Sequence, residues 1–258
     1  MNYTRSAYVF DPKSVRPFKL SRSKIELFVQ CPRCFYLDLR RGIKRPSFPS
    51  FTLNSAVDFL LKKEFDIHRS GGTIHPLMKT YGLQAIPFAH PKMEQYRHNF
   101  TGLGCKYEGT NIWLYGAVDD IWINNDRELL IVDYKSTSSD EPVTLDGKWK
   151  EGYKRQMEIY QWLARREAGL KQWLVANTGY FVYCNGRKDK QAFDGKLEFS
   201  VQIIPYVGDD SWIEKVLKEM YECLLAETMP ESASDCEHCL YRQKAVQEEI
   251  WGGKTLFG

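Results

Sequence analysis

The stretch Leu129–Ser136, with the sequence LLIVDYKS, constrains the fold of this chain more than any other. A short run of Leu, Ile and Val that ends in polar residues predicts a buried β-strand. Side chains alternate along a strand, so Asp133 and Lys135 project from the same face where the strand surfaces. These residues form either an ordinary surface ion pair or part of a polar site, and this stretch alone leaves both interpretations open.

The rest of the sequence alternates between helix and strand patterns. We expect strands at residues 106–123, 128–134, 174–184 and 196–206, and helices at residues 24–39, 55–67, 151–167 and 211–227. Pro32 divides the first helix, because it removes a helical hydrogen bond. Asn54 or Ser55 caps the second helix, and Gly71-Gly72 ends it.

Turn signals between the early strands suggest their topology. Residues 109–111 and 124–126 are polar and contain Gly, Asn and Asp, so residues 106–134 predict three strands in an antiparallel meander. Residues 73–100 contain three prolines and predict one or two short helices. Together these patterns predict an α/β fold with a mixed central sheet flanked by helices.

Length and composition limit the domain organisation. The chain has 258 residues and 43% apolar residues, enough for one large domain or two small ones. We expect an N-terminal arm at residues 1–20, one domain at residues 21–241 and a C-terminal tail at residues 242–258. The sequence shows neither a charged-then-apolar leader nor an apolar run of membrane-spanning length, so we expect a cytoplasmic protein without a membrane partner.

A second acidic residue belongs with the opening stretch. If the strands around residues 124–126 form a hairpin, Asp119 lies near Asp133 or one pair beyond it. Two neighbouring carboxylates repel each other, and a hard cation such as Mg²⁺ compensates them. Lys135 then lies beside the cation, where it can polarise a phosphate oxygen or position a water molecule. Gln156 and Tyr160 share one helix face, either at this site or as a flank packed on the sheet.

These motifs, in this order, resemble the PD-(D/E)XK nucleases of the RecB-like branch, including the CRISPR-associated and AddB-type iron–sulfur exonucleases. The matching segments are GAVDDIWI, LLIVDYKSTS, QMEIYQWL and SRSKIELFVQCPRCFYL, and they extend with gaps over residues 21–241. The resemblance implies a restriction-endonuclease-like fold and a DNA nuclease dependent on Mg²⁺ or Mn²⁺, acting as an exonuclease on single-stranded ends. It also implies protein partners in DNA repair, recombination or CRISPR adaptation.

The resemblance further implies roles for individual residues. Asp119 and Asp133 would be metal ligands, Tyr134 would offer its backbone carbonyl, and Lys135 would be the catalytic lysine. One position departs from the pattern, because Asp58 stands where RecB-like members usually place a metal-binding His. Asp58 either completes the metal site, marks an altered or inactive site, or is a solvated helix residue.

Four of the seven cysteines form two Cys-x-x-Cys pairs about 200 residues apart, Cys31 with Cys34 and Cys236 with Cys239. Such pairs predict a four-thiolate metal site that ties the two ends of the chain together. The resemblance favours a 4Fe-4S cluster there. The last cysteine of that pattern is absent, however, so Zn²⁺ remains the alternative.

Four cations follow the first cysteine pair, at Arg40, Arg41, Lys44 and Arg45. They form either a solvated surface or an edge that contacts nucleic-acid phosphates. The net charge of the chain is only +3, so charge alone does not demonstrate a DNA partner. Three hypotheses therefore remain: a nuclease, a nuclease-fold subunit that binds nucleic acid without cutting it, and a metal-bearing interaction module.

Overall fold

The computed structural model describes residues 8–47 and 51–251. The chain forms two compact units, which we describe separately. The larger unit contains Lys19–Arg22 and the described residues of Pro49–Ile213. The smaller unit contains the described residues of Met1–Phe18, Ser23–Phe48 and Glu214–Gly258.

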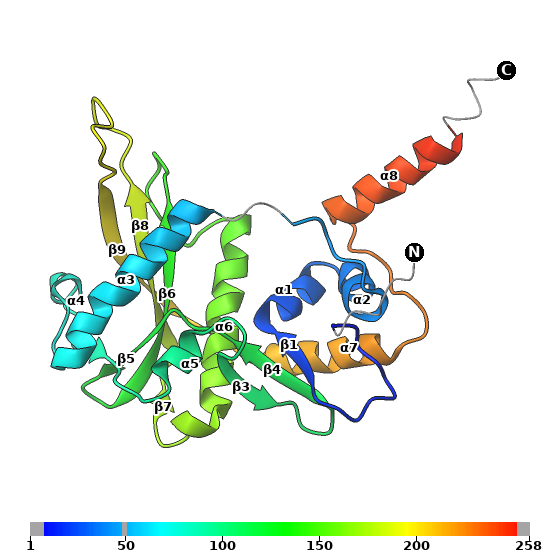
Figure 1. The fold of residues 1–258 in the computed structure, drawn as a ribbon, viewed down its shortest axis with the longest axis horizontal. Coiled ribbons are helices and arrows are strands. Elements are labelled where there is room, and N and C mark those ends of the chain that lie inside the picture. Colours follow the sequence, from blue (N-terminus) through cyan, green and yellow to red (C-terminus); the bar gives the residue numbers. More distant parts are fainter. Residues whose placement is uncertain (1–7, 48–50, 252–258) are drawn as a thin grey trace. The chain divides into compact units, whose positions relative to one another are not determined.

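Two sheets form the framework of the larger unit (Figure 1). The six-stranded sheet follows the order β2 (Ala85–Pro87), β5 (Asp120–Asn124), β6 (Glu128–Thr137), β8 (Thr178–Gly186) and β9 (Phe199–Val207), with β7 (Leu174–Val175) also paired to β6. The three-stranded sheet follows the order β1 (Phe18–Ser21), β4 (Ile112–Gly116) and β3 (Leu103–Lys106). The predicted mixed sheet with flanking helices is confirmed.

The strand β6 lies in the interior of the larger sheet and contains the opening stretch of the sequence. It pairs antiparallel with β5 and parallel with β8. Residues 129–134 are buried, as the apolar run predicts. A parallel pair needs a crossover connection, and α6 (Glu151–Arg166) lies on the chain between β6 and β8. This helix is the one predicted at residues 151–167.

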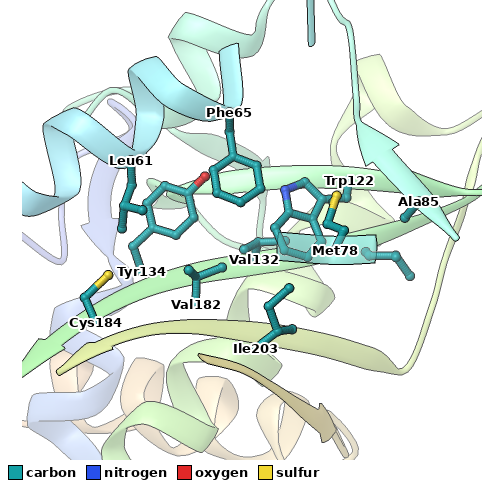
Figure 2. Packing of buried hydrophobic residues seen from close by; sticks show 11 residues of the cluster. Leu61, Phe65, Met78, Ala85, Trp122, Val132, Tyr134, Val182, Cys184 and Ile203 are labelled. Atoms are coloured by element: carbon teal, nitrogen blue, oxygen red, sulfur yellow. The ribbon is translucent and has the colours of Figure 1, made fainter. Parts of the chain in front are cut away.

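The helix α3 (Thr52–Gly71) covers one face of the sheet with an apolar core (Figures 1 and 2). The Phe65 ring lies 5.3 Å from that of Trp122 and 5.7 Å from that of Tyr134, centroid to centroid. Tyr134 alternates with Asp133 along β6, so Asp133 faces the opposite side, where α6 lies. The sheet therefore presents an apolar face to α3 and a polar strand end to α6.

The expected three-stranded meander is wrong. Its middle strand breaks after Gly116, so β4 pairs with β3 in one sheet and β5 pairs with β6 in the other. A Cβ on Gly116 would lie only 2.8 Å from the Tyr160 ring and 3.1 Å from Leu163. This glycine lets α6 approach the chain closely where it leaves the smaller sheet.

The remaining helices of the larger unit are short. The segment with three prolines forms α4 (Pro76–Thr80) and α5 (Met93–Arg97), as predicted, and single 3₁₀ turns lie at Lys148–Lys150 and Ala168–Leu170. The cap prediction for α3 is wrong, because the helix begins after Phe51 without a side-chain cap. Its end is as predicted, since Gly72 closes it in the left-handed conformation.

The smaller unit is helical. The predicted break at Pro32 separates α1 (Arg22–Gln30) from α2 (Pro32–Arg41). These helices pack in the same unit as α7 (Ile213–Leu225), and α8 (Glu237–Trp251) extends towards the C-terminus. The Tyr36 hydroxyl lies within hydrogen-bonding distance of the carbonyl oxygens of Ala226 and Glu227, at 3.3 and 3.2 Å. In the described part of the chain, every helix is too short or too polar to cross a membrane.

Candidate active site and four-cysteine centre

Two carboxylates lie side by side where β5 and β6 begin to separate. Asp120 pairs with Val132, so Asp119 occupies the next position, beside Asp133. The backbone N–H of Tyr134 donates a 2.8 Å hydrogen bond to Asp119 Oδ2. The hairpin thus fixes Asp119 near Asp133, as the strand pattern predicts.

Asp133, Lys135, Gln156 and Tyr160 meet on the face of β6 that α6 covers. Asp133 is fully buried, and the Lys135 ammonium contacts its Oδ2. Gln156 Nε2 lies 2.8 Å from Asp133 Oδ1 and 3.1 Å from the Tyr160 hydroxyl. Lys135 Nζ is also 3.4 Å from Gln156 Oε1. The structure therefore brings four of the predicted site residues into one network.

The electrostatics of this network follow from burial and like charge. Burial raises the pKa of the Asp133 carboxyl to about 6, the Lys135 ammonium opposes this shift, and the charge of Asp119 adds to it. Burial disfavours the charge of Lys135, but Asp133 and Asp119 outweigh it and raise the pKa of Lys135 above its ordinary value. Lys135 is therefore charged at neutral pH. Asp119 and Asp133 still repel each other, and a further cation bound between them would reduce this repulsion.

Asp58 also reaches this site, through a lysine that the sequence analysis missed. Lys62 Nζ lies 2.8 Å from Asp58 Oδ2 and 3.3 Å from Asp119 Oδ1. Burial and the charge of Asp119 raise the pKa of Asp58, and Lys62 opposes the rise. The i,i+4 spacing of Asp58 and Lys62 was the available signal, since it places both on one helix face.

Asp120, the second residue missed, anchors the site from the opposite face of β5. It is fully buried and contacts the guanidinium of Arg69, while Arg97 Nη2 lies 3.1 Å from its Oδ1. The Tyr134 hydroxyl donates a 2.9 Å hydrogen bond to its Oδ2. The Asp-Asp doublet was the available signal, because strand alternation sends Asp119 and Asp120 to opposite faces.

The acidic residues offer oxygen donors of the kind that Mg²⁺ and Mn²⁺ prefer. One ammonium already lies between Asp58 and Asp119, which shows that their oxygens converge on a point that a cation can occupy. The donor set therefore fits a hard divalent cation. In the described ranges, however, only the four cysteines form a group of three or more potential ligands with donor atoms within 4.8 Å of one another.

The four-cysteine centre lies in the smaller unit. Cys31 precedes α2, Cys34 is in its first turn, and Cys236 and Cys239 lie at the start of α8. All four are buried, with Sγ–Sγ separations of 3.8 Å between Cys31 and Cys239 and 3.6 Å from Cys34 to both Cys236 and Cys239. The predicted meeting of the two pairs is confirmed.

The four predicted phosphate-contacting cations have partners within the smaller unit. Arg40 donates a 3.4 Å hydrogen bond to the Phe10 carbonyl, and Arg41 donates a 3.5 Å bond to the Tyr36 hydroxyl. The Lys44 ammonium lies 5.4 Å from the centroid of the Tyr8 ring. Arg45 donates a 2.8 Å bond to the side-chain oxygen of Gln30. Arg45 also reaches Cys236 Sγ at 3.5 Å. These cations therefore support the packing around α2 and the cysteines.

The chain also matches a family of known proteins. The family model of the PD-(D/E)XK nuclease superfamily matches residues 73–243, and the chain belongs to this superfamily. Among matching solved structures is the crystal structure of SSO0001, which is 16% identical, with 87% of this chain and 84% of that chain covered and a TM-score of 0.43. No curated protein sequence matches this chain.

Asp119 and Asp120 have different ion-pair partners, so their alanine variants should differ in stability. Asp120→Ala removes the fully buried carboxylate that Arg69 and Arg97 share and leaves them only the half-buried Asp66 as an acidic partner. We expect it to lower the free energy of unfolding by about 3–5 kcal/mol. Asp119→Ala removes a partly exposed carboxylate and should cost less than about 2 kcal/mol. Urea denaturation of both variants measures the difference, and equal losses would contradict the anchoring role of Asp120.

Proposed function

We propose that this chain is a metal-dependent nuclease that hydrolyses phosphodiester bonds in DNA. The observation that carries the proposal is the network of Asp119, Asp133, Lys135 and Gln156 at the end of β6. It unites an acidic pair, the Lys135 ammonium and a half-buried amide within a chain of the PD-(D/E)XK superfamily.

Each residue has a distinct role in this proposal. Asp119, Asp133, the Tyr134 backbone carbonyl and Asp58 would hold Mg²⁺ or Mn²⁺, which supplies a Lewis acid and lowers the pKa of bound water. The Lys135 ammonium stabilises the negative charge that develops on the phosphate oxygens and orients the attacking water.

Gln156 and Tyr160 complete the proposed machinery as positioning residues. The Gln156 amide lies within hydrogen-bonding distance of Asp133, Lys135 and the Tyr160 hydroxyl, so it fixes the first two relative to each other. Tyr160 is buried beside Gly116, against which its ring packs. Both residues hold the ionic groups in place while a substrate phosphate approaches.

A second candidate is a protein of the same fold that binds nucleic acid without cutting it. Two residues support this candidate. Asp58 stands where the RecB-like pattern has His, and the Lys62 ammonium forms ion pairs with Asp58 and Asp119, two of the proposed metal ligands. In that case the acidic pair would be a structural ion-pair network. Protein partners in DNA repair, recombination or CRISPR adaptation fit either candidate and rest on the resemblance alone.

A single-stranded substrate is supported by a row of cations and aromatic rings that begins at Lys135. The ammonium groups of Lys135 and Lys150 lie 4.7 and 5.3 Å from the Tyr153 ring centroid, and that of Lys150 lies 4.7 Å from the Tyr183 ring. Trp149, next to Lys150, is 88% exposed. Of these rings only that of Trp149 is fully open to solvent, since Tyr153 is half-buried and Tyr183 is buried. An exposed ring beside cations suits an unpaired base, which stacks on it while the cations attract the backbone.

The smaller unit offers a second region for phosphate contacts. A cavity of about 400 Å³ lies beside the four-cysteine centre, and Lys44, Arg45 and Arg242 are among its lining residues. We propose that nucleic-acid phosphates contact this cavity, with Arg40 and Arg41 supporting its wall from α2. The contact between Arg45 and Cys236 would then couple this region to the metal centre.

We further propose that the four cysteines hold one Zn²⁺ ion rather than a 4Fe-4S cluster. Tetrahedral coordination with Zn–S bonds of about 2.3 Å places sulfur atoms about 3.8 Å apart. The observed separations of 3.6 and 3.8 Å agree with that spacing. A cluster of four irons and four sulfides needs thiolates that are farther apart. The ion would contribute to folding by joining α2 to α8.

Cleavage of labelled DNA in Mn²⁺ or Mg²⁺ tests the nuclease proposal. We expect wild-type protein to cut single-stranded DNA, and Asp133→Asn and Lys135→Met each to lower the rate at least about 100-fold. The first removes the charge of a proposed metal ligand, and the second removes the ammonium that opposes the negative charge of the transition state. Lys171→Met, on an exposed turn, serves as the matched control and should keep wild-type activity. Binding without cleavage by the wild type would favour the second candidate.

Replacement of Trp149 tests the single-strand preference. Trp149→Leu keeps an apolar side chain but removes the aromatic face, and we expect it to weaken binding of single-stranded oligonucleotides roughly 5- to 100-fold. Trp149→Phe should retain most of the affinity, and duplex binding should not change. Fluorescence anisotropy without added Mg²⁺ or Mn²⁺, in the Asp133→Asn background, measures these affinities. An equal loss for single strands and duplex would argue against base stacking.

Metal analysis of anaerobically purified protein tests the four-cysteine proposal. We expect a colourless protein with about one zinc per chain. Cys239→Ser should lose the zinc and melt at a lower temperature, whereas Cys223→Ser, outside the centre, should retain it. A brown protein with iron and sulfide would show the cluster instead.

A further inference from the structure

The ammonium of Lys62 occupies the space between two proposed metal ligands that come from different elements. Its Nζ lies 2.8 Å from Asp58 Oδ2 on α3 and 3.3 Å from Asp119 Oδ1 on the loop before β5. We infer that Lys62 is an internal cation that competes with the divalent ion, so that metal binding by Asp58 and Asp119 requires its displacement. This inference rests on the proposed function, because it takes Asp119 as a metal ligand.

The two cations cannot share this space. Mg²⁺ lies about 2.1 Å from its oxygen ligands. An ion bound to both carboxylates would therefore lie close to the present position of Lys62 Nζ, where the two positive charges repel strongly. The Lys62 side chain is 21% exposed, so it has a route to solvent when the ion enters.

The need for an internal cation follows from the two carboxylates themselves. Asp58 is partly buried and lies near the carboxylate of Asp119, so the two like charges repel each other. In the metal-free protein Lys62 offsets this repulsion and keeps both side chains directed at the site. The consequence is a weaker apparent affinity for the divalent ion, because that ion must displace the Lys62 ammonium before it binds both carboxylates.

Direct binding of Mn²⁺ to the whole 258-residue chain tests the competition without depending on cleavage. We measure free Mn²⁺ by electron paramagnetic resonance during titration of the wild type, Lys62→Met and Lys63→Met. Lys63 is the matched control, because it follows Lys62 on α3 and its ammonium lies over the Phe59 ring, 4.5 Å from the centroid. We expect Lys62→Met to bind Mn²⁺ roughly tenfold more tightly than the wild type and Lys63→Met to bind like the wild type.

Two further variants show whether the gain arises from the proposed ligands. Lys62→Arg keeps the positive charge and should not show the gain. Asp58→Asn in the Lys62→Met background should lose most of it, because one of the two ligands is removed. Thermal melting of each variant confirms that it is folded before titration.

The outcomes separate this inference from the proposed function. If the wild type binds Mn²⁺, Asp119→Asn does not, and folded Lys62→Met binds no more tightly than the wild type, the metal site stands and the competition is wrong. If neither the wild type nor Lys62→Met binds Mn²⁺, both the metal site and the competition are wrong.

Discussion

The proximity of Asp119 and Asp133 is the constraint on which the rest of the site depends. Two carboxylates at the end of a buried strand repel each other, and the protein compensates them with two ammonium groups. Lys135 neutralises Asp133 from the same strand, and Lys62 neutralises Asp119 from α3. The surrounding fold holds these four charges together, and the proposed chemistry uses the same concentration of charge.

Strand alternation explains how one segment serves both packing and chemistry. On β6, Tyr134 enters the apolar core beneath α3, while Asp133 and Lys135 face α6. Around the start of β5, Asp119 reaches the site and Asp120 binds Arg69 and Arg97 behind it. The acidic pair is therefore placed by a hairpin whose opposite face is held by apolar packing and a buried ionic network.

Local sequence patterns predicted much of this arrangement. The buried strand at β6, the break at Pro32 and the end of α3 at Gly72 depend on residues close in sequence, and the structure confirms them. The meeting of the four cysteines was predictable because two Cys-x-x-Cys pairs in one chain are a recurring metal-binding pattern.

Other features depend on residues that are distant in sequence. The expected meander was wrong because its middle strand breaks after Gly116, where Tyr160 of the distant helix α6 packs closely against the chain. Lys62 and Asp120 were missed because their partners, Asp119 for the first and Arg69 and Arg97 for the second, are brought near only by folding. The spacing of the cysteine sulfur atoms, on which the zinc proposal rests, is likewise a property of the folded chain.

Crystals soaked in Mn²⁺ and examined by anomalous diffraction test the central claim most directly. The account predicts an anomalous peak bounded by the carboxylates of Asp119 and Asp133, with Asp58 as a further ligand and the Lys62 ammonium moved away. A fully soaked crystal with no peak at these carboxylates, and Lys62 still bound between Asp58 and Asp119, would contradict it.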